Sequence, residues 1–219
     1  MSNYLKLLTF LISLSLTSLF TTEAQADIQL LESTIKNLRP FTCRFSQVYY
    51  DAFQQRTVSA TGAFSFMQPG LMKWRYEDPE EMLFIVGREK AWLYDPDLEN
   101  VTIQVLEEVS GIRSLRFLSD DKRISDHFTP MTPEKTFLDT FKDSQFIYLS
   151  PLKKNQALAE LQIVFDEKKH QILQFVLVDH NRNYRKITLT DLIYDHNLKE
   201  SDFEFTVTES MEVIQGFEN

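Results

Sequence analysis

The stretch SFMQPGLMKWRYEDP, residues 65–79, decides how most of this chain folds. Two runs of alternating side chains meet at QPG (68–70), which is typical of a tight turn between strands. Side chains two positions apart share one face of a strand. The second run therefore places Met72, Trp74 and Tyr76 together, and Trp74 is expected to anchor a β-sheet.

The same alternation recurs on both sides of this hairpin. Turn-forming sequences such as DPE, VGREK and DPDLEN separate the runs, so neighbouring strands should pair antiparallel. We predict a single, mainly β sheet of roughly eleven strands, which has to curl. The expected strands are 41–50, 57–67, 71–77, 82–86, 90–94, 100–106, 145–150, 158–166, 171–179, 183–194 and 203–207.

Three short helices are expected beside this sheet. Apolar residues recur at helical spacing over 27–38, until Pro40 ends the segment. A three-residue repeat predicts a second helix within 107–120, and TPEKTFLDTF (132–141) has the capping residues of a third. If these helices cover the concave face of the sheet, they enclose an apolar space.

The first 26 residues read as a targeting segment. Lys6 precedes an apolar run over 7–20, and Ala-Gln-Ala (24–26) is a small-x-small cleavage signal. Cleavage would leave one exported domain, 27–219. The chain carries 23 Lys and Arg against 32 Asp and Glu, a net charge of −9, which disfavours nucleic acid as a partner.

No residue pattern indicates catalysis, a cofactor or a metal. The single cysteine, Cys43, lies on the apolar side of an alternating strand and is expected to be buried. Asp179-His180 and Asp195-His196 fall at strand ends, where solvated turns are favoured over zinc ligands. Glycine-rich phosphate loops and nucleophile elbows are absent from the sequence. We therefore predict a protein that is not an enzyme.

Residues 45–106 resemble the periplasmic outer-membrane lipoprotein carrier family, the LolA family. The matching positions follow the family signature in order and spacing: Phe45, Gln47, Gly62, Pro69, Trp74, Pro79, Trp92, Tyr94, Asp95 and Pro96. The resemblance implies an incomplete antiparallel β-barrel whose concave face is lidded by about three helices. It also implies that the apolar cavity holds lipoprotein acyl chains, whose exposure to water costs about 0.8 kcal/mol per methylene.

The resemblance also implies which partners the protein has and which residues line its cavity. An inner-membrane ATP-driven lipoprotein-releasing complex would supply the cargo, and an outer-membrane receptor lipoprotein would accept it. Trp74, Trp92 and Tyr94 are expected to be structural, and the protein to be a monomer. The residues expected to form the acyl cavity and its lid are Ile28, Leu31, Ile35, Leu38, Phe45, Phe64, Phe66, Ile112, Leu115, Phe165 and Phe175. Phe203 and Phe205 belong to the same aromatic strand pattern.

Gln68 departs from the family, which typically has Arg at this position. The resemblance assigns that Arg to hydrogen bonds that couple lid closure to cargo transfer. Glutamine still donates and accepts hydrogen bonds but carries no charge. We expect Gln68 to be the gating residue, with a weaker latch, or one supplied instead by Arg75 or Arg44.

Two other functions remain open at this level. A periplasmic lipid or lipoprotein sensor would use the same cavity, although related sensors carry a second domain for which 27–219 leaves no room. A scaffold that binds nothing would fill its core with its own side chains. Binding of an acylated peptide distinguishes the carrier from the scaffold.

Overall fold

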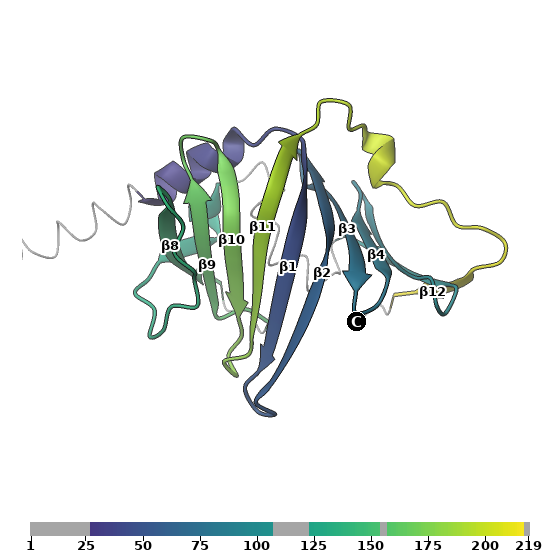
Figure 1. Cartoon of the computed structure of the whole chain (residues 1–219), viewed down its shortest axis with the longest axis horizontal. Helices are drawn as coiled ribbons and strands as arrows, with labels where there is room; N and C mark the ends of the chain where they lie inside the picture. The colour runs from purple at the N-terminus through teal and green to yellow at the C-terminus, as the bar shows by residue number, and fades with distance from the viewer. Residues whose placement is uncertain (1–26, 107–122, 154–156, 217–219) are drawn as a thin grey trace, which may run out of the picture.

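The computed structural model describes residues 27–106, 123–153 and 157–216. Twelve strands form one sheet in the order β12-β6-β5-β4-β3-β2-β1-β11-β10-β9-β8-β7. Neighbouring strands pair antiparallel, except that β12 runs parallel to β6. Strands towards both edges curve away behind the central strands in Figure 1. Because β7 and β12 remain edge strands, the sheet is an incomplete barrel, as predicted.

The strand boundaries follow the alternating pattern closely. The strands are β1 (Phe41–Asp51), β2 (Arg56–Met67), β3 (Leu71–Asp78), β4 (Met82–Val86), β5 (Lys90–Asp95), β6 (Asn100–Val105), β7 (Phe128–Pro130), β8 (Gln145–Pro151), β9 (Glu160–Asp166), β10 (Gln171–Val178), β11 (Tyr184–Tyr194) and β12 (Glu212–Gln215). Sequence alternation did not anticipate β7 and β12, which are short edge strands.

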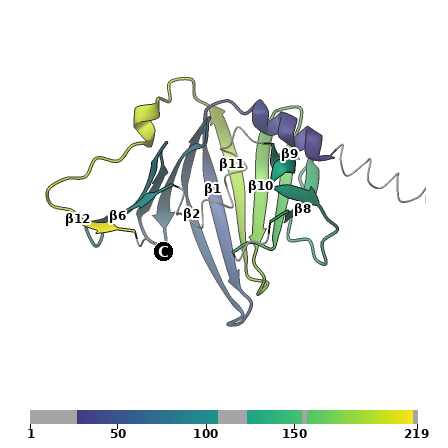
Figure 2. The same ribbon diagram turned by 180° about the vertical axis from the view of Figure 1, so that it is seen from behind.

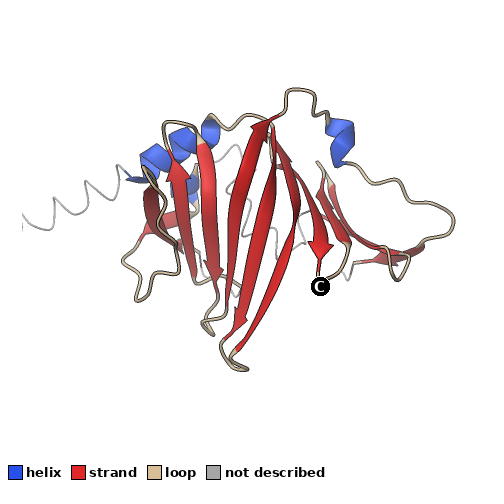
Figure 3. Cartoon of the chain, in the orientation of Figure 1, coloured by secondary structure: helices blue, strands red, loops and turns tan. Residues whose placement is uncertain are grey.

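The strand expected at 203–207 is wrong. Residues Glu200–Phe203 form a 3-10 helix, η3, and the chain then continues without regular structure to β12. Phe203 is fully buried, while the residues on either side of it are exposed. The alternation in FEF therefore comes from the burial of Phe203 alone and not from a strand. We call residues 198–216 the C-terminal segment; after η3 it loops outward beyond the side of the sheet that carries β3 and β4, and it returns to the sheet as β12 (Figures 1 and 3).

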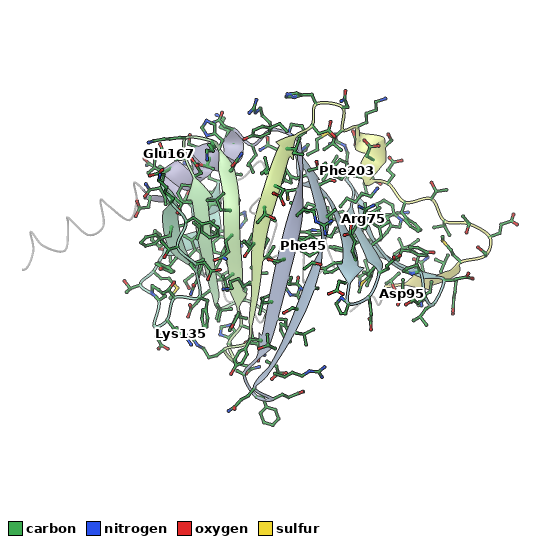
Figure 4. All side chains as sticks on the ribbon, in the orientation of Figure 1. Phe45, Arg75, Asp95, Lys135, Glu167 and Phe203 are labelled. Atoms are coloured by element: carbon green, nitrogen blue, oxygen red, sulfur yellow. The ribbon has the colours of Figure 1, made fainter. Side chains whose placement is uncertain are left out.

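The helix expected at 132–141 is also wrong, because this segment has no regular secondary structure and bends at 134–135. Gln162 and Gln174, both fully buried on the sheet, accept hydrogen bonds from the backbone N–H groups of Phe137 at 2.9 Å and Asp139 at 2.8 Å. The Gln162 amide also donates to the Lys135 carbonyl at 2.9 Å. Lys135, labelled in Figure 4, marks this segment. Side chains of the sheet therefore replace the hydrogen bonds of a helix.

One helix, residues 27–36, precedes the sheet, and we call it the N-terminal helix. Its apolar stripe packs on the sheet, and it ends where the Asn37 side chain donates to the Ser33 carbonyl at 2.8 Å. It lies across one end of the sheet, opposite the end where β1 and β2 join (Figures 1 and 2). The helix expected within 107–120, including Ile112 and Leu115, lies outside the described residues.

The sheet has two differently covered faces. The face that carries Phe45 and Phe64 packs against the N-terminal helix and forms the main core, and we call it the inner face. The outer face carries a smaller core of Leu71, Ile85 and Phe203 beneath the C-terminal segment. Further along, the irregular segment 131–144 packs on β9, and β9 is buried along its whole length.

Candidate functional site

The centre of the inner face is an aromatic cluster on β1, β2 and β3. The Phe64 ring stacks on Trp74 with centroids 4.0 Å apart, and Phe45 meets Trp74 edge-on at 5.0 Å. Phe41 contacts both Phe64 and Phe66, at 5.8 and 5.5 Å. Cross-strand registry produces this cluster, because Phe64 lies opposite Trp74 and Phe66 opposite Met72. Trp74 thus belongs to the same surface as the predicted cavity residues.

Glycine at position 62 makes room for this cluster. It lies opposite Phe45 on β1, whose ring rests over it (Phe45 is labelled in Figure 4). A Cβ at position 62 would come within 2.7 Å of the Phe45 ring and 2.0 Å of the Arg75 carbonyl oxygen. The close approach of two strands therefore accounts for Gly62.

The structure brings most of the predicted cavity and lid residues together. One buried cluster on the inner face and the N-terminal helix contains Ile28, Leu31, Leu38, Phe45, Phe64, Phe66, Phe165 and Phe175. Ile35 is partly buried and packs against the same cluster. These side chains pack against one another, and the N-terminal helix covers them.

Side-chain hydrogen bonds at two places tether the N-terminal helix to other described parts of the fold. The Gln68 amide, just after β2, donates to the backbone carbonyl of Ile35 at 2.7 Å. The Glu32 carboxylate accepts hydrogen bonds from Ser125 of η2 (Ile124–Asp126), from the hydroxyl at 2.7 Å and the backbone N–H at 2.9 Å. A neutral bond such as that of Gln68 contributes about 1 kcal/mol, and a bond to a carboxylate such as Glu32 about 1.5–3 kcal/mol. These polar contacts add to the apolar packing that holds the helix on the sheet.

Arg44 and Arg75 are not in the position of a latch. Both guanidinium groups contact the Glu77 carboxylate, at 2.8 and 3.0 Å, on the outer face of the sheet. The hydrogen bond from Arg44, with Arg75 adding to it, lowers the pKa of Glu77. The alternative that either arginine replaces Gln68 at the helix is therefore wrong.

Thr34 is a polar group within the interface between helix and sheet. Its side chain is fully buried, and its hydroxyl oxygen has no hydrogen-bond partner among the described residues. An unpaired buried hydroxyl opposes burial by about 1–3 kcal/mol. The helical pattern in the sequence missed this residue because it is not apolar. The N-terminal helix is consequently packed less favourably than an all-apolar stripe would allow.

Replacing Thr34 by valine should tighten this interface. Thr34→Val keeps the branched shape and removes the unpaired hydroxyl, so we expect the free energy of unfolding to rise by about 1 kcal/mol. Urea denaturation measures it. Thr34→Ser is the matched control, which keeps the hydroxyl, loses a methyl group and should be less stable. An unchanged or lower value for the valine variant would contradict this account of Thr34.

Cys43 lies within the same inner face, opposite Phe64 on β2. It is buried, as predicted, with 5% of its surface exposed. Burial, followed by the charge of Asp191, raises the pKa of the thiol to about 12. The group is therefore a protonated, shielded thiol at neutral pH, and its reaction with a thiol reagent reports exposure of the inner face.

Trp92 and Tyr94 lie outside the inner face. Trp92 packs with the small outer core around Leu71 and Phe203, and the Tyr94 ring lies 5.1 Å from Phe205. Phe203 and Phe205 therefore cover the outer face, although their strand pattern suggested the cavity (Phe203 is labelled in Figure 4). A bidentate contact between Arg88 and the Glu200 carboxylate holds the C-terminal segment there.

The described residues contain neither a group of three or more His, Cys, Asp and Glu side chains suited to a metal nor a helix long and apolar enough to span a membrane. Asp179 accepts hydrogen bonds from Asn181 and Asn183, as expected of a turn residue. Asp195 accepts one from the Asn197 N–H. Both Asp-His pairs therefore lie in polar turns.

Comparisons with known proteins agree with this architecture. Residues 36–206 match the family described as outer membrane lipoprotein carrier protein LolA. The outer-membrane lipoprotein carrier protein of Pseudomonas paraeruginosa is 31% identical over 200 residues, which cover 91% of this chain and 92% of that protein. The protein of the same name from Azotobacter vinelandii is 29% identical over 196 residues, or 88% and 91%.

A solved structure supports the fold. An uncharacterized conserved protein from Thermus thermophilus superposes with a TM-score of 0.50 at 13% identity, over 86% of this chain and 98% of that one. The family match spans most of the strands that build the inner face, and it confirms the resemblance recognised in the signature around Trp74. This chain belongs to the family of outer-membrane lipoprotein carrier proteins.

Proposed function

We propose that this protein is a periplasmic chaperone that carries lipoproteins from the inner membrane to the outer membrane. The observation that supports the proposal best is the aromatic inner face, which is covered by a helix with few polar tethers. Lipoprotein acyl chains need such a face because exposing each methylene to water costs about 0.8 kcal/mol. Membership of the carrier family supports the same role.

The proposed cycle needs partners at both membranes. An inner-membrane ATP-driven lipoprotein-releasing complex would load the carrier, and an outer-membrane receptor lipoprotein would accept the cargo. Residues 1–26 would direct export and be removed, which leaves 27–219 as one carrier domain. The carrier would act without a cofactor and catalyse no reaction.

Loading would require the N-terminal helix to move away from the sheet. Leu31, Phe64 and the other buried members of the cluster would then exchange contacts within the cluster for contacts with acyl chains. Apolar contacts are non-directional, so cargo can replace the helix at modest net cost. Gln68 would bias the balance through its bond to Ile35, because cargo shifts the equilibrium only by its differential affinity for the open form.

Binding of a triacylated peptide tests this function directly. We expect the secreted, delipidated protein to bind the acylated peptide and to ignore the same peptide without acyl chains. Native mass spectrometry gives the bound mass, and the reaction rate of Cys43 with a thiol reagent reports the state of the inner face. No bound species in the presence of excess acylated peptide would contradict the carrier role and favour a packed scaffold.

A further inference from the structure

The β1–β2 hairpin projects from the sheet at the end opposite the N-terminal helix (Figures 1 and 2). Its turn carries Phe53, whose surface is 96% exposed, the largest exposed fraction among the large hydrophobic residues described. A phenylalanine this exposed loses the stabilisation that burial would give it. We call residues 49–58 and the adjacent turn 179–185 the hairpin end.

The turn that presents Phe53 is well ordered by hydrogen bonds. The Asp51 carboxylate accepts from the N–H groups of Phe53 at 2.9 Å and Gln54 at 2.8 Å. The Ala52 N–H donates to the side chain of Asn183 in the β10–β11 turn at 2.8 Å. Two neighbouring turns thus support each other, and the Phe53 ring points away from a rigid base.

Further aromatic groups surround this base. Tyr50 stacks on Tyr184 with centroids 5.2 Å apart, and the Phe137 ring lies 4.5 Å from Tyr184 on the other side. Tyr49 lies 6.0 Å from the Arg185 guanidinium. Tyrosines with one apolar and one polar end are typical of the boundary between lipid and water.

The charges of the hairpin end favour an anionic surface. Its two carboxylates are hydrogen-bonded within the turns: Asp51 accepts from the N–H groups of Phe53 and Gln54, and Asp179 accepts from those of Asn181 and Asn183. Arg56 and Arg185, in contrast, are exposed, and neither forms an ion pair with an acidic side chain in the described parts of the chain. This arrangement contrasts with the net charge of −9 of the whole chain.

We propose that the hairpin end docks on a bilayer that contains anionic phospholipid, with Phe53 entering the headgroup region and Arg56 and Arg185 facing the phosphates. An exposed apolar tip flanked by cations has the two components of peripheral membrane binding, apolar insertion and attraction to anionic headgroups. The inference does not depend on the carrier role. The turn between β1 and β2 lies at the end of the sheet opposite the N-terminal helix (Figure 1), and Phe53 is not a member of the buried inner cluster.

Vesicle flotation of the secreted protein tests the proposal. We expect binding to vesicles of phosphatidylethanolamine and phosphatidylglycerol, weaker binding to phosphatidylcholine alone, and loss of binding at high salt. Phe53→Asp should lower the partition coefficient about tenfold, since it removes the inserted ring. Phe146→Asp is the matched control, because Phe146 is also exposed, at 61%, but lies on β8, and it should partition as the unmodified protein does.

A fluorescent label reports insertion itself. Phe53→Cys labelled with nitrobenzoxadiazole should brighten and shift to the blue on anionic vesicles, whereas labelled Phe146→Cys should not; the shielded Cys43 will not compete for the label. Equal partitioning of Phe53→Asp and the unmodified protein, an absent spectral shift, or no vesicle binding at all would overturn the proposal. Phe53→Asp should still bind acylated peptide, so failure here leaves the carrier role to its own test.

Discussion

A protein whose N-terminal helix is crosslinked to η2 is expected to take up no acylated peptide. Glu32 and Ser125 already touch through their side chains, so a Glu32→Cys/Ser125→Cys pair can be joined by a short, reducible bifunctional thiol reagent without forcing the backbone apart. The crosslink would hold Leu31 of the helix and Phe64 of the inner face in their buried positions, which are among the most deeply buried of the described residues. Acyl chains would then have no apolar surface to reach.

The experiment has internal controls. Burial of the Cys43 thiol and its pKa of about 12 leave the two introduced cysteines as the reactive groups. Reduction of the crosslink should restore uptake in the same sample, and a monofunctional reagent on the same double variant should not block it. Uptake that is equal before and after crosslinking would show that the N-terminal helix is no lid.

The second large effect is expected at Gln68. Gln68→Arg replaces a neutral donor to the Ile35 carbonyl by a charged one, which strengthens such a bond by about 1 kcal/mol. A more stable closed form raises the cost of opening, so the apparent affinity for acylated peptide should fall about fivefold. Release to an acceptor should become faster, because the closed, cargo-free form that remains after release is more stable in the variant.

Gln68→Leu should have the opposite effect, since it removes the donor. We expect tighter apparent binding and a faster reaction of Cys43 with a thiol reagent in the cargo-free protein. Gln215→Arg, which adds the same charge at an exposed glutamine on β12, is the matched control and should alter neither quantity. Identical peptide affinity and release rate for Gln68→Arg and the unmodified protein would show that the bond to Ile35 has no gating role.

Local sequence chemistry determined most of the sheet. Alternating side chains specify which residues share a face, and Pro, Gly and Asp in the short connections specify where the chain reverses, so β1 to β6 and β8 to β11 follow from neighbours in sequence. The same alternation placed Phe45, Phe64 and Phe66 on one buried surface. The apolar stripe of the N-terminal helix likewise predicted that it would cover that surface.

Tertiary structure decided the segments whose backbone hydrogen bonds come from elsewhere. TPEKTFLDTF has helical capping residues, yet Gln162 and Gln174 from distant strands accept hydrogen bonds from two of its N–H groups, and it forms no helix. Phe203 and Phe205 alternate like strand residues, but in the folded protein they pack on the outer face of the sheet, next to Trp92. The partners of Gln68 and Glu32 were equally invisible, because they lie 33 and 93 residues away. A side chain's spacing predicts its face, whereas its partner depends on which distant segment the folded sheet brings within hydrogen-bonding distance.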